Sequence, residues 1–81
     1  MKTSDRYEYE TTDLALAAFL TARGHKLVGV GGTPSRSVFA FERSAGLVGD
    51  TLAWANNAPV RIAARTMFNS LRDLKGVAAT F

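Results

Sequence analysis

The sequence predicts an α+β domain in which a small antiparallel sheet is packed by helices on one face. Three observations support this prediction. Short segments early in the chain alternate polar and apolar residues, two such segments flank a glycine-rich turn, and the last third follows the three-and-four spacing of an amphipathic helix. The expected order of elements is strand, helix, strand, strand, short helix, long helix. One sheet with its helices on a single face is the simplest arrangement for that order.

The first expected element is a strand at residues 5–10. Tyr7 and Tyr9 alternate there with charged residues, which is typical of a half-buried strand. We expect residues 1–4 before it to be disordered. We also expect residues 1–81 to form a single domain, because 81 residues suffice for one hydrophobic core and are too few for two.

A helix is expected next, at about residues 13–23, where alanine and leucine are frequent. Either Thr11 or Thr12 is suited to cap it, because a threonine hydroxyl accepts a hydrogen bond from a free N–H of the first turn. Asp13 then lies where the helix dipole favours a negative charge. Gly24 is expected to end the helix, since glycine readily adopts the left-handed conformation found just beyond a helix.

A β-hairpin is expected after this helix. Residues 26–31 form its first strand, residues 31–35 form the turn, and residues 36–43 form the second strand. Phe39 and Phe41 are two residues apart and therefore share one face of the sheet, while the residues between and before them face the other side. The two phenylalanines are expected to belong to the core.

Two helices are expected to complete the fold. Residues 44–46 close the hairpin, and a short helix then lies within residues 47–57 and ends at Asn56–Asn57. A long helix follows with Pro59 in its first turn, where proline is favoured. Gly76 either frays this helix or ends it. Apolar residues follow the helical period along it, namely Val60, Ala63, Ala64, Met67, Leu71, Leu74 and Ala78.

The composition argues against several classes of function. Cysteine is absent and His25 is the only histidine, so we expect no disulfide, no structural zinc site, no cofactor and no catalytic constellation. We therefore do not expect the protein to be an enzyme. No apolar run approaches the ~20 residues that cross a bilayer, and the first residues lack the apolar core of a signal peptide. We therefore expect a cytoplasmic protein that does not bind membranes.

Basic residues on the last helix form the main candidate binding site. At 100° per residue, Arg61, Arg65 and Arg72 fall within about 40° of one another. Lys75 flanks them, and Phe68 lies where the basic stripe meets the apolar arc. Guanidinium groups beside an aromatic ring suit phosphates, stacked bases or an acidic protein surface. The alternative is a solvated face whose arginines pair with the acidic N-terminal segment.

Two further residues are candidates for the same surface. Arg36 ends the glycine-rich segment 29–36, whose backbone amides could cradle a phosphate; a flexible hairpin tip is the simpler interpretation. Trp54 is either a core aromatic or, if it is exposed near the basic stripe, an interface residue, because tryptophan is favoured at binding hot spots.

Several short segments, from Thr11-Thr12-Asp13-Leu14 through Phe39-Ala40-Phe41 to Leu71-Arg72-Asp73-Leu74-Lys75, share a pattern with known proteins. By these segments the chain resembles an uncharacterised domain-of-unknown-function family of small bacterial and phage proteins. The resemblance spans nearly the whole chain and implies no activity and no catalytic residues. It implies a phage or mobile-element setting, in which small basic proteins bind nucleic acid or block host machinery. The matching segments are Thr11-Thr12-Asp13-Leu14, Ala17-Ala18-Phe19-Leu20, Gly24, Leu27-Val28-Gly29-Val30, Phe39-Ala40-Phe41 and Leu71-Arg72-Asp73-Leu74-Lys75.

Together these features predict a non-catalytic binding module of phage or mobile-element type. The expected partner is a protein, such as a component of host nucleic-acid machinery. The alternative is direct DNA or RNA binding through the basic helix face. Self-association into a homo-oligomer is a further alternative, because a domain of this size without disulfide or metal has a small core relative to its surface.

Overall fold

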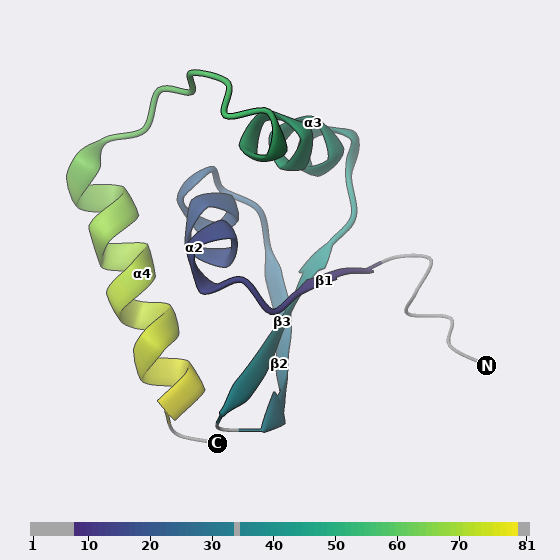
Figure 1. Ribbon diagram of the computed structural model, residues 1–81, viewed down its shortest axis with the longest axis vertical. Coiled ribbons are helices and arrows are strands. Elements are labelled where there is room, and N and C mark those ends of the chain that lie inside the picture. The colour runs from purple at the N-terminus through teal and green to yellow at the C-terminus, as the bar shows by residue number, and fades with distance from the viewer. Residues whose placement is uncertain (1–7, 34, 80–81) are drawn as a thin grey trace.

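The computed structural model describes residues 8–33 and 35–79, and Figure 1 shows their arrangement. The expected α+β fold and the expected order of elements are both confirmed. The expected disorder of residues 1–4 lies outside the described residues. The elements are β1 (Glu8–Thr11), α2 (Leu14–Ala22), β2 (Leu27–Thr33), β3 (Arg36–Glu42), α3 (Ala45–Ala55) and α4 (Ala64–Ala79).

The sheet has three antiparallel strands in the order β1-β3-β2, so the predicted hairpin of β2 and β3 is confirmed. Residues opposite each other on neighbouring strands point to the same side of a sheet. Tyr9 on β1 and Leu27 on β2 are both opposite Phe41, and Val30 is opposite Phe39. These five side chains make one face apolar.

The helices cover this apolar face in two layers. Figure 1 shows α2 lying between the sheet and α4, with α3 crossing one end of the stack. The largest fully buried side chains are Phe39 and Phe41 from the sheet, Leu20 from α2 and Leu47 from α3. The core therefore lies between the sheet and α2, and α4 closes the outer side of α2. As predicted, both phenylalanines belong to the core.

Helix α2 is capped by Asp13, and the prediction that a threonine caps it is wrong. One carboxylate oxygen of Asp13 accepts hydrogen bonds from the backbone nitrogens of Ala15 at 3.0 Å and Leu16 at 3.2 Å. A carboxylate both accepts these bonds and meets the positive end of the helix dipole, which a neutral hydroxyl does not. Thr11 instead accepts a bond from the Asp13 backbone nitrogen at 3.1 Å. Gly24 follows the helix with φ +94°, as its predicted role requires.

Helix α3 begins earlier than the sequence suggested. The Ser44 hydroxyl accepts a hydrogen bond from the Leu47 backbone nitrogen at 3.0 Å and so caps the helix. Residues 45–46 therefore belong to the helix and do not close the hairpin. The predicted end is confirmed, because Asn56 is the C-terminal cap residue and Asn57 has φ +53°.

Helix α4 begins at Ala64, and the prediction of a helix from Pro59 is wrong. Val60 and Ile62 are half-buried while Arg61 and Ala63 are exposed. This alternation has the two-residue period of an extended chain. Val60 also fits the helical pattern of the sequence, but in the structure it lies half-buried in an extended connection. The helix continues without interruption through Gly76. Among the described residues, no helix has both the length and the apolar character needed to cross a bilayer.

Candidate binding surface

Helix α4 is amphipathic, and its outward side carries most of its charge. Leu74, which is 3% exposed, and the half-buried Met67 mark its inward side. At 100° per residue, Lys75, Phe68, Arg72 and Arg65 fall within an arc of about 80° that points away from Leu74. We call these four residues the α4 outer face: Arg65, Phe68, Arg72 and Lys75.

Phe68 is the most exposed large apolar residue among the described residues, at 66%. Its ring borders a shallow hollow of about 250 Å³ that Leu71, Arg72 and Lys75 also line. Phe68 is neither in the hydrophobic core nor among the partly buried residues that pack against it. An exposed aromatic ring beside arginine has the composition of a binding hot spot, where a partner would remove the ring from water.

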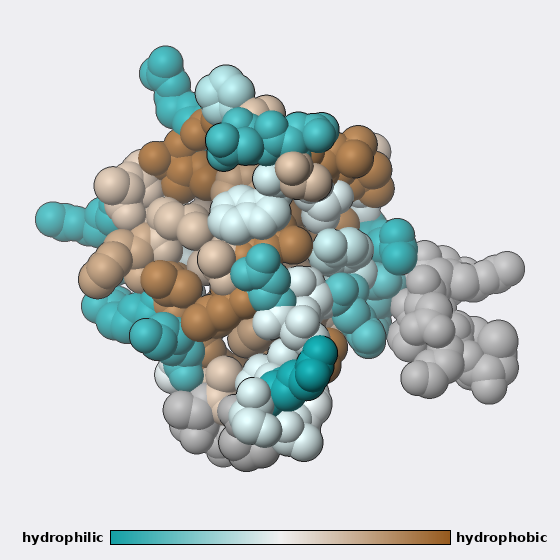
Figure 2. All heavy atoms as spheres, in the orientation of Figure 1, coloured by the Kyte–Doolittle hydropathy of each residue, from teal (hydrophilic) through white to brown (hydrophobic). Residues whose placement is uncertain are grey.

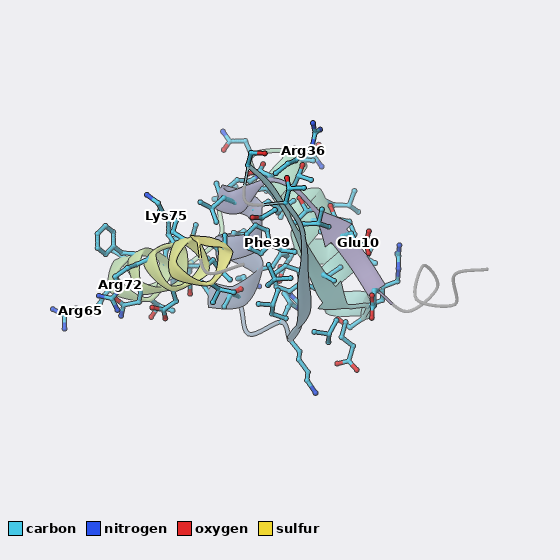
Figure 3. The ribbon with its side chains drawn as sticks, turned by 90° about the horizontal axis from the view of Figure 1, so that it is seen from below. Glu10, Arg36, Phe39, Arg65, Arg72 and Lys75 are labelled. Atoms are coloured by element: carbon cyan, nitrogen blue, oxygen red, sulfur yellow. The ribbon has the colours of Figure 1, made fainter. Side chains whose placement is uncertain are left out.

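The cations around Phe68 are almost free of partners within the molecule. The guanidinium of Arg72 lies 3.6 Å from the carboxylate of Asp73, and both side chains are about two-thirds exposed. Such an exposed pair is weak. Among the described residues, Arg65 and Lys75 form no hydrogen bond or ion pair. Figure 3 shows the three cations directed from α4 away from the sheet, so they are available to a partner.

Two predicted members of this surface lie elsewhere. Arg61 precedes α4 in the extended connection, so the predicted helical stripe of three arginines is reduced to Arg65 and Arg72. Arg36 lies at the tip of the β2–β3 hairpin and lines a separate hollow of about 380 Å³. Figure 3 places Arg36 apart from Arg65 and Arg72. The structure therefore does not bring the hairpin tip into the α4 outer face.

Trp54 also lies outside the α4 outer face. Its ring centroid is 5.1 Å from that of Phe19, the two rings are tilted by 40°, and the residue is 36% exposed. It is thus a rim aromatic packed on the core. Figure 2 shows apolar residues gathered between α3 and α4 on this side of the molecule. They line a hollow of about 450 Å³ that is distinct from the one beside Phe68, formed by Phe19, Ala53, Trp54, Asn57, Ala58, Val60, Ile62 and Met67.

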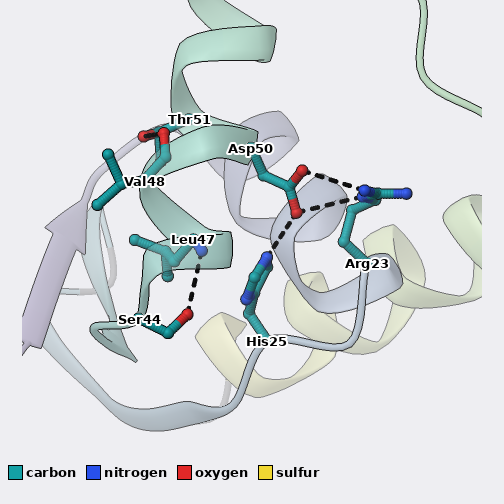
Figure 4. A network of polar contacts seen from close by, with 7 residues as sticks. All are labelled: Arg23, His25, Ser44, Leu47, Val48, Asp50 and Thr51. Carbon is teal, nitrogen blue, oxygen red and sulfur yellow. Dashed lines mark hydrogen bonds and ion pairs between the residues drawn. The ribbon is translucent and has the colours of Figure 1, made fainter.

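A polar network at the junction of α2 and α3 involves His25 and was not predicted from the sequence. Nε2 of His25 lies 2.6 Å from one carboxylate oxygen of Asp50. Two nitrogens of Arg23 donate to the two oxygens of the same carboxylate, each at 3.2 Å (Figure 4). No local pattern signals this contact, because Asp50 is 25 residues from His25 and is brought to it only by the packing of α3 on α2.

Burial and hydrogen bonding act on the pKa of Asp50 in opposite directions. Burial disfavours the charged carboxylate and raises the pKa. The hydrogen bonds from Arg23 and His25, together with their positive charges, outweigh this effect and lower the pKa below its ordinary value of 3.8. The ionised carboxylate is therefore the form that this junction stabilises.

The network has the geometry of a structural clamp. Ser44 lies in the same region, but its hydroxyl is engaged in capping α3. Within the described residues its hydroxyl makes no hydrogen bond to His25, and neither His25 nor Asp50 lines any hollow named above. Residues 8–33 and 35–79 also contain no group of three or more His, Asp or Glu side chains placed to hold a metal ion.

These observations define a small α+β domain whose sheet is covered on one face and whose last helix exposes an aromatic ring among cations. The chain belongs to the family described as "Domain of unknown function (DUF5659)", whose model matches residues 6–79. The predicted resemblance to an uncharacterised family is confirmed at that level. No curated protein and no solved structure gives a significant match to the chain.

Proposed function

We propose that this protein is a non-catalytic binding module whose α4 outer face holds a protein partner. The observation that supports this most directly is Phe68, which is 66% exposed among cations that are nearly free of internal partners. Aromatic residues and arginine are enriched in the buried centres of protein interfaces. The partner would present an apolar pocket for Phe68 with carboxylates around it.

The proposal that the module is non-catalytic has its own support. The one histidine and its neighbouring carboxylate are both taken up by the clamp with Arg23. A general base must also come within hydrogen-bond reach of a substrate group. The His25 side chain is only 13% exposed, and His25 lines none of the hollows described above.

We also propose a phage or mobile-element setting in the cytoplasm, which is the setting that the sequence resemblance implies. We propose a component of host nucleic-acid machinery as the partner. The surface of that component in contact with α4 would carry carboxylates, which attract the basic face. The domain would modulate that component by occupying its surface.

The test is affinity capture from the native host with the wild-type chain, with Phe68→Ala and with Thr66→Ala. Thr66 is also exposed on α4 but lies outside the outer face, so it is the matched control. We expect Phe68→Ala to reduce the amount of captured protein at least about tenfold, which is the effect of a modest hot spot. Thr66→Ala should retain it. Equal capture by all three chains, with or without nuclease, would remove Phe68 from the interface and contradict the proposal.

The alternative function is direct binding of DNA or RNA, and the unpaired cations Arg65 and Lys75 favour it. Phosphate contacts make affinity fall with salt, with a slope of about 0.9 per neutralised phosphate on duplex DNA. A mobility-shift assay at low salt should then show binding that Arg65→Glu weakens more than Lys26→Glu, which changes the net charge equally at an exposed residue elsewhere. No shift at low salt would exclude this alternative.

A further inference from the structure

The side of the sheet turned away from α2 forms a second exposed surface. Glu8 is opposite Glu42 there, Glu10 and Gly29 are both opposite Ala40, and Gly31 is opposite Val38. Glu10, Glu42, Gly29 and Gly31 are all exposed. We call these seven residues the open sheet face: Glu8, Glu10, Gly29, Gly31, Val38, Ala40 and Glu42.

Two glycines on the open sheet face are not required by the fold of the single chain. Gly32 has φ +85°, and a Cβ there would clash with the Arg36 carbonyl oxygen, so the hairpin requires glycine at this position. Gly29 and Gly31 have no such φ, and a Cβ at either meets nothing within 4 Å. Glycine weakens a strand, and within one it often marks the close approach of another backbone. The open space above these two glycines is suited to a docking helix.

The same face is hollowed and carries unpaired negative charge. Glu10, Thr11, Thr12 and Val38 line a shallow hollow of about 400 Å³. None of the three glutamates forms an ion pair within the described part of the chain. Glu8 and Glu42 lie directly opposite each other, where like charges repel. A positively charged partner would relieve that repulsion.

Among the described residues, the cations beside this face lie at its two ends. Lys26, whose carbonyl oxygen accepts a hydrogen bond from the Glu42 backbone nitrogen at 3.0 Å, is at the Glu42 end. Arg36 occupies the hairpin end. At the other end Arg43 donates through Nε to the Glu8 carbonyl oxygen at 3.0 Å, without an ion pair to the Glu8 carboxylate. The middle of the face, around Glu10, is therefore acidic and open.

We propose that the open sheet face is the docking site for the α4 outer face of a second copy of this chain. The two faces are complementary in charge. One has three cations around an exposed Phe68. The other has three carboxylates, a shallow hollow lined by Glu10 and Val38 among others, and two glycines on β2 with open space above them. Figure 3 places them on opposite sides of the molecule, with Arg72 beyond α4 and Glu10 beyond the sheet. One molecule therefore cannot join its own two faces.

Such a contact is head-to-tail, because each copy uses a different face. The first and last copies keep one face free, so assembly grows with concentration unless it closes into a ring. The inference rests on the proposed function in that both use the α4 outer face as a binding surface. A second copy docked there would cover Phe68 and would therefore compete with the partner.

The test uses two complementary double variants whose mass is measured by sedimentation. Phe68→Asp with Arg72→Glu breaks the α4 outer face and leaves the sheet intact. Glu10→Lys with Gly31→Leu breaks the open sheet face and leaves α4 intact. We expect the wild type to form species above its monomer mass of 8.7 kDa as concentration rises. Each double variant alone should remain monomeric, and their equimolar mixture should form a dimer and nothing larger.

The dimer in the mixture would show that both variants are folded, because each contributes its unaltered face. Three results would overturn the proposal: a wild type that stays monomeric at every concentration, a double variant that still associates alone, or a mixture that stays monomeric while the wild type associates. If either double variant is unfolded by circular dichroism, the single variants Arg72→Glu and Glu10→Lys replace them. Each should weaken association at least tenfold, and an unchanged association would equally reject the proposal.

Gly31→Leu alone separates docking from folding. A leucine fits the open space and favours a strand, so the monomer should be at least as stable as the wild type while association is lost. The control is Gly49→Leu on α3, where a Cβ also meets nothing within 4 Å and the open sheet face is untouched. None of these measurements involves a partner. A monomeric wild type would reject self-docking and leave the proposed partner binding in place.

Discussion

At the junction of α2 and α3, Arg23 places two nitrogens on the carboxylate of Asp50 at 3.2 Å each, whereas on α4 the Nε of Arg72 approaches Asp73 only to 3.6 Å. The Asp50 side chain is 13% exposed and the Asp73 side chain is 70% exposed. The same two residue types therefore form a bidentate pair with a sheltered carboxylate in one region and a loose, solvated pair in the other.

The difference comes from which elements the pairs join. Arg23 and Asp50 are 27 residues apart, so their contact connects two helices and contributes to the fold. Arg72 and Asp73 are neighbours on one helix, where adjacent side chains do not face each other. The junction thus uses its arginine for stability, while α4 leaves its arginines available for binding. Predictions that remove groups from each region test this division.

The largest expected effect is at the junction. Asp50→Ala removes a sheltered carboxylate that accepts three hydrogen bonds, and bonds to charged groups contribute about 1.5–3 kcal/mol. We expect the free energy of unfolding, measured by urea denaturation, to fall by about 2 kcal/mol. The matched variant Asp73→Ala should change it by less than about 0.5 kcal/mol, since exposed pairs contribute little. Equal losses in the two variants would show that the two regions do not differ.

A double-mutant cycle refines this comparison. Arg23→Ala and Asp50→Ala should be strongly non-additive, because each removes the same interaction. Arg72→Ala and Asp73→Ala should be additive within error. An additive result at the junction would mean that Arg23 contributes through its packing rather than through its two hydrogen bonds to Asp50.

The elements that could be predicted from the sequence are those specified by local patterns. The alternation around Phe39 and Phe41 predicted a strand and its buried face, and Gly24 predicted the end of α2. These signals act over a few residues, so no tertiary information is needed to interpret them. The α4 outer face was also partly predictable, because Arg65, Phe68 and Arg72 recur with the helical period.

Features that depend on packing could not be predicted. Val60 fits the period of a helix, but it lies half-buried in an extended connection. Only the position of the core distinguishes the two arrangements. The clamp joins His25 to a carboxylate 25 residues away, so no spacing in the sequence indicates it. The open sheet face depends on strand pairing, which places Glu8 opposite Glu42 across 34 residues.

A smaller effect is expected from pH. The pKa of Asp50 is lowered in the folded chain, so its ionised form stabilises the fold fully above the ordinary pKa of 3.8. That stability is lost as pH falls through the lowered value. The free energy of unfolding in urea should be measured at several pH values from about 5 downward. Below about pH 4 the difference between the wild type and Asp50→Ala should shrink. A difference between the two chains that stays constant down to the acid limit would mean that Asp50 contributes by contact alone and not by its charge.

The smallest expected change in stability is at Phe68. Its ring is 66% exposed, so truncation to alanine removes little buried area. Alanine also has a higher helix propensity than phenylalanine, by up to about 0.7 kcal/mol. Phe68→Ala should therefore leave the free energy of unfolding unchanged or raise it slightly, in the same denaturation experiment in which Asp50→Ala lowers it. A loss of more than about 1 kcal/mol would show that the ring packs within the single chain. Unchanged stability combined with lost binding would instead mean that Phe68 contributes to binding and not to the fold. The two arginine–aspartate pairs indicate the same difference, with a stabilising contact at the junction and residues available for binding on α4.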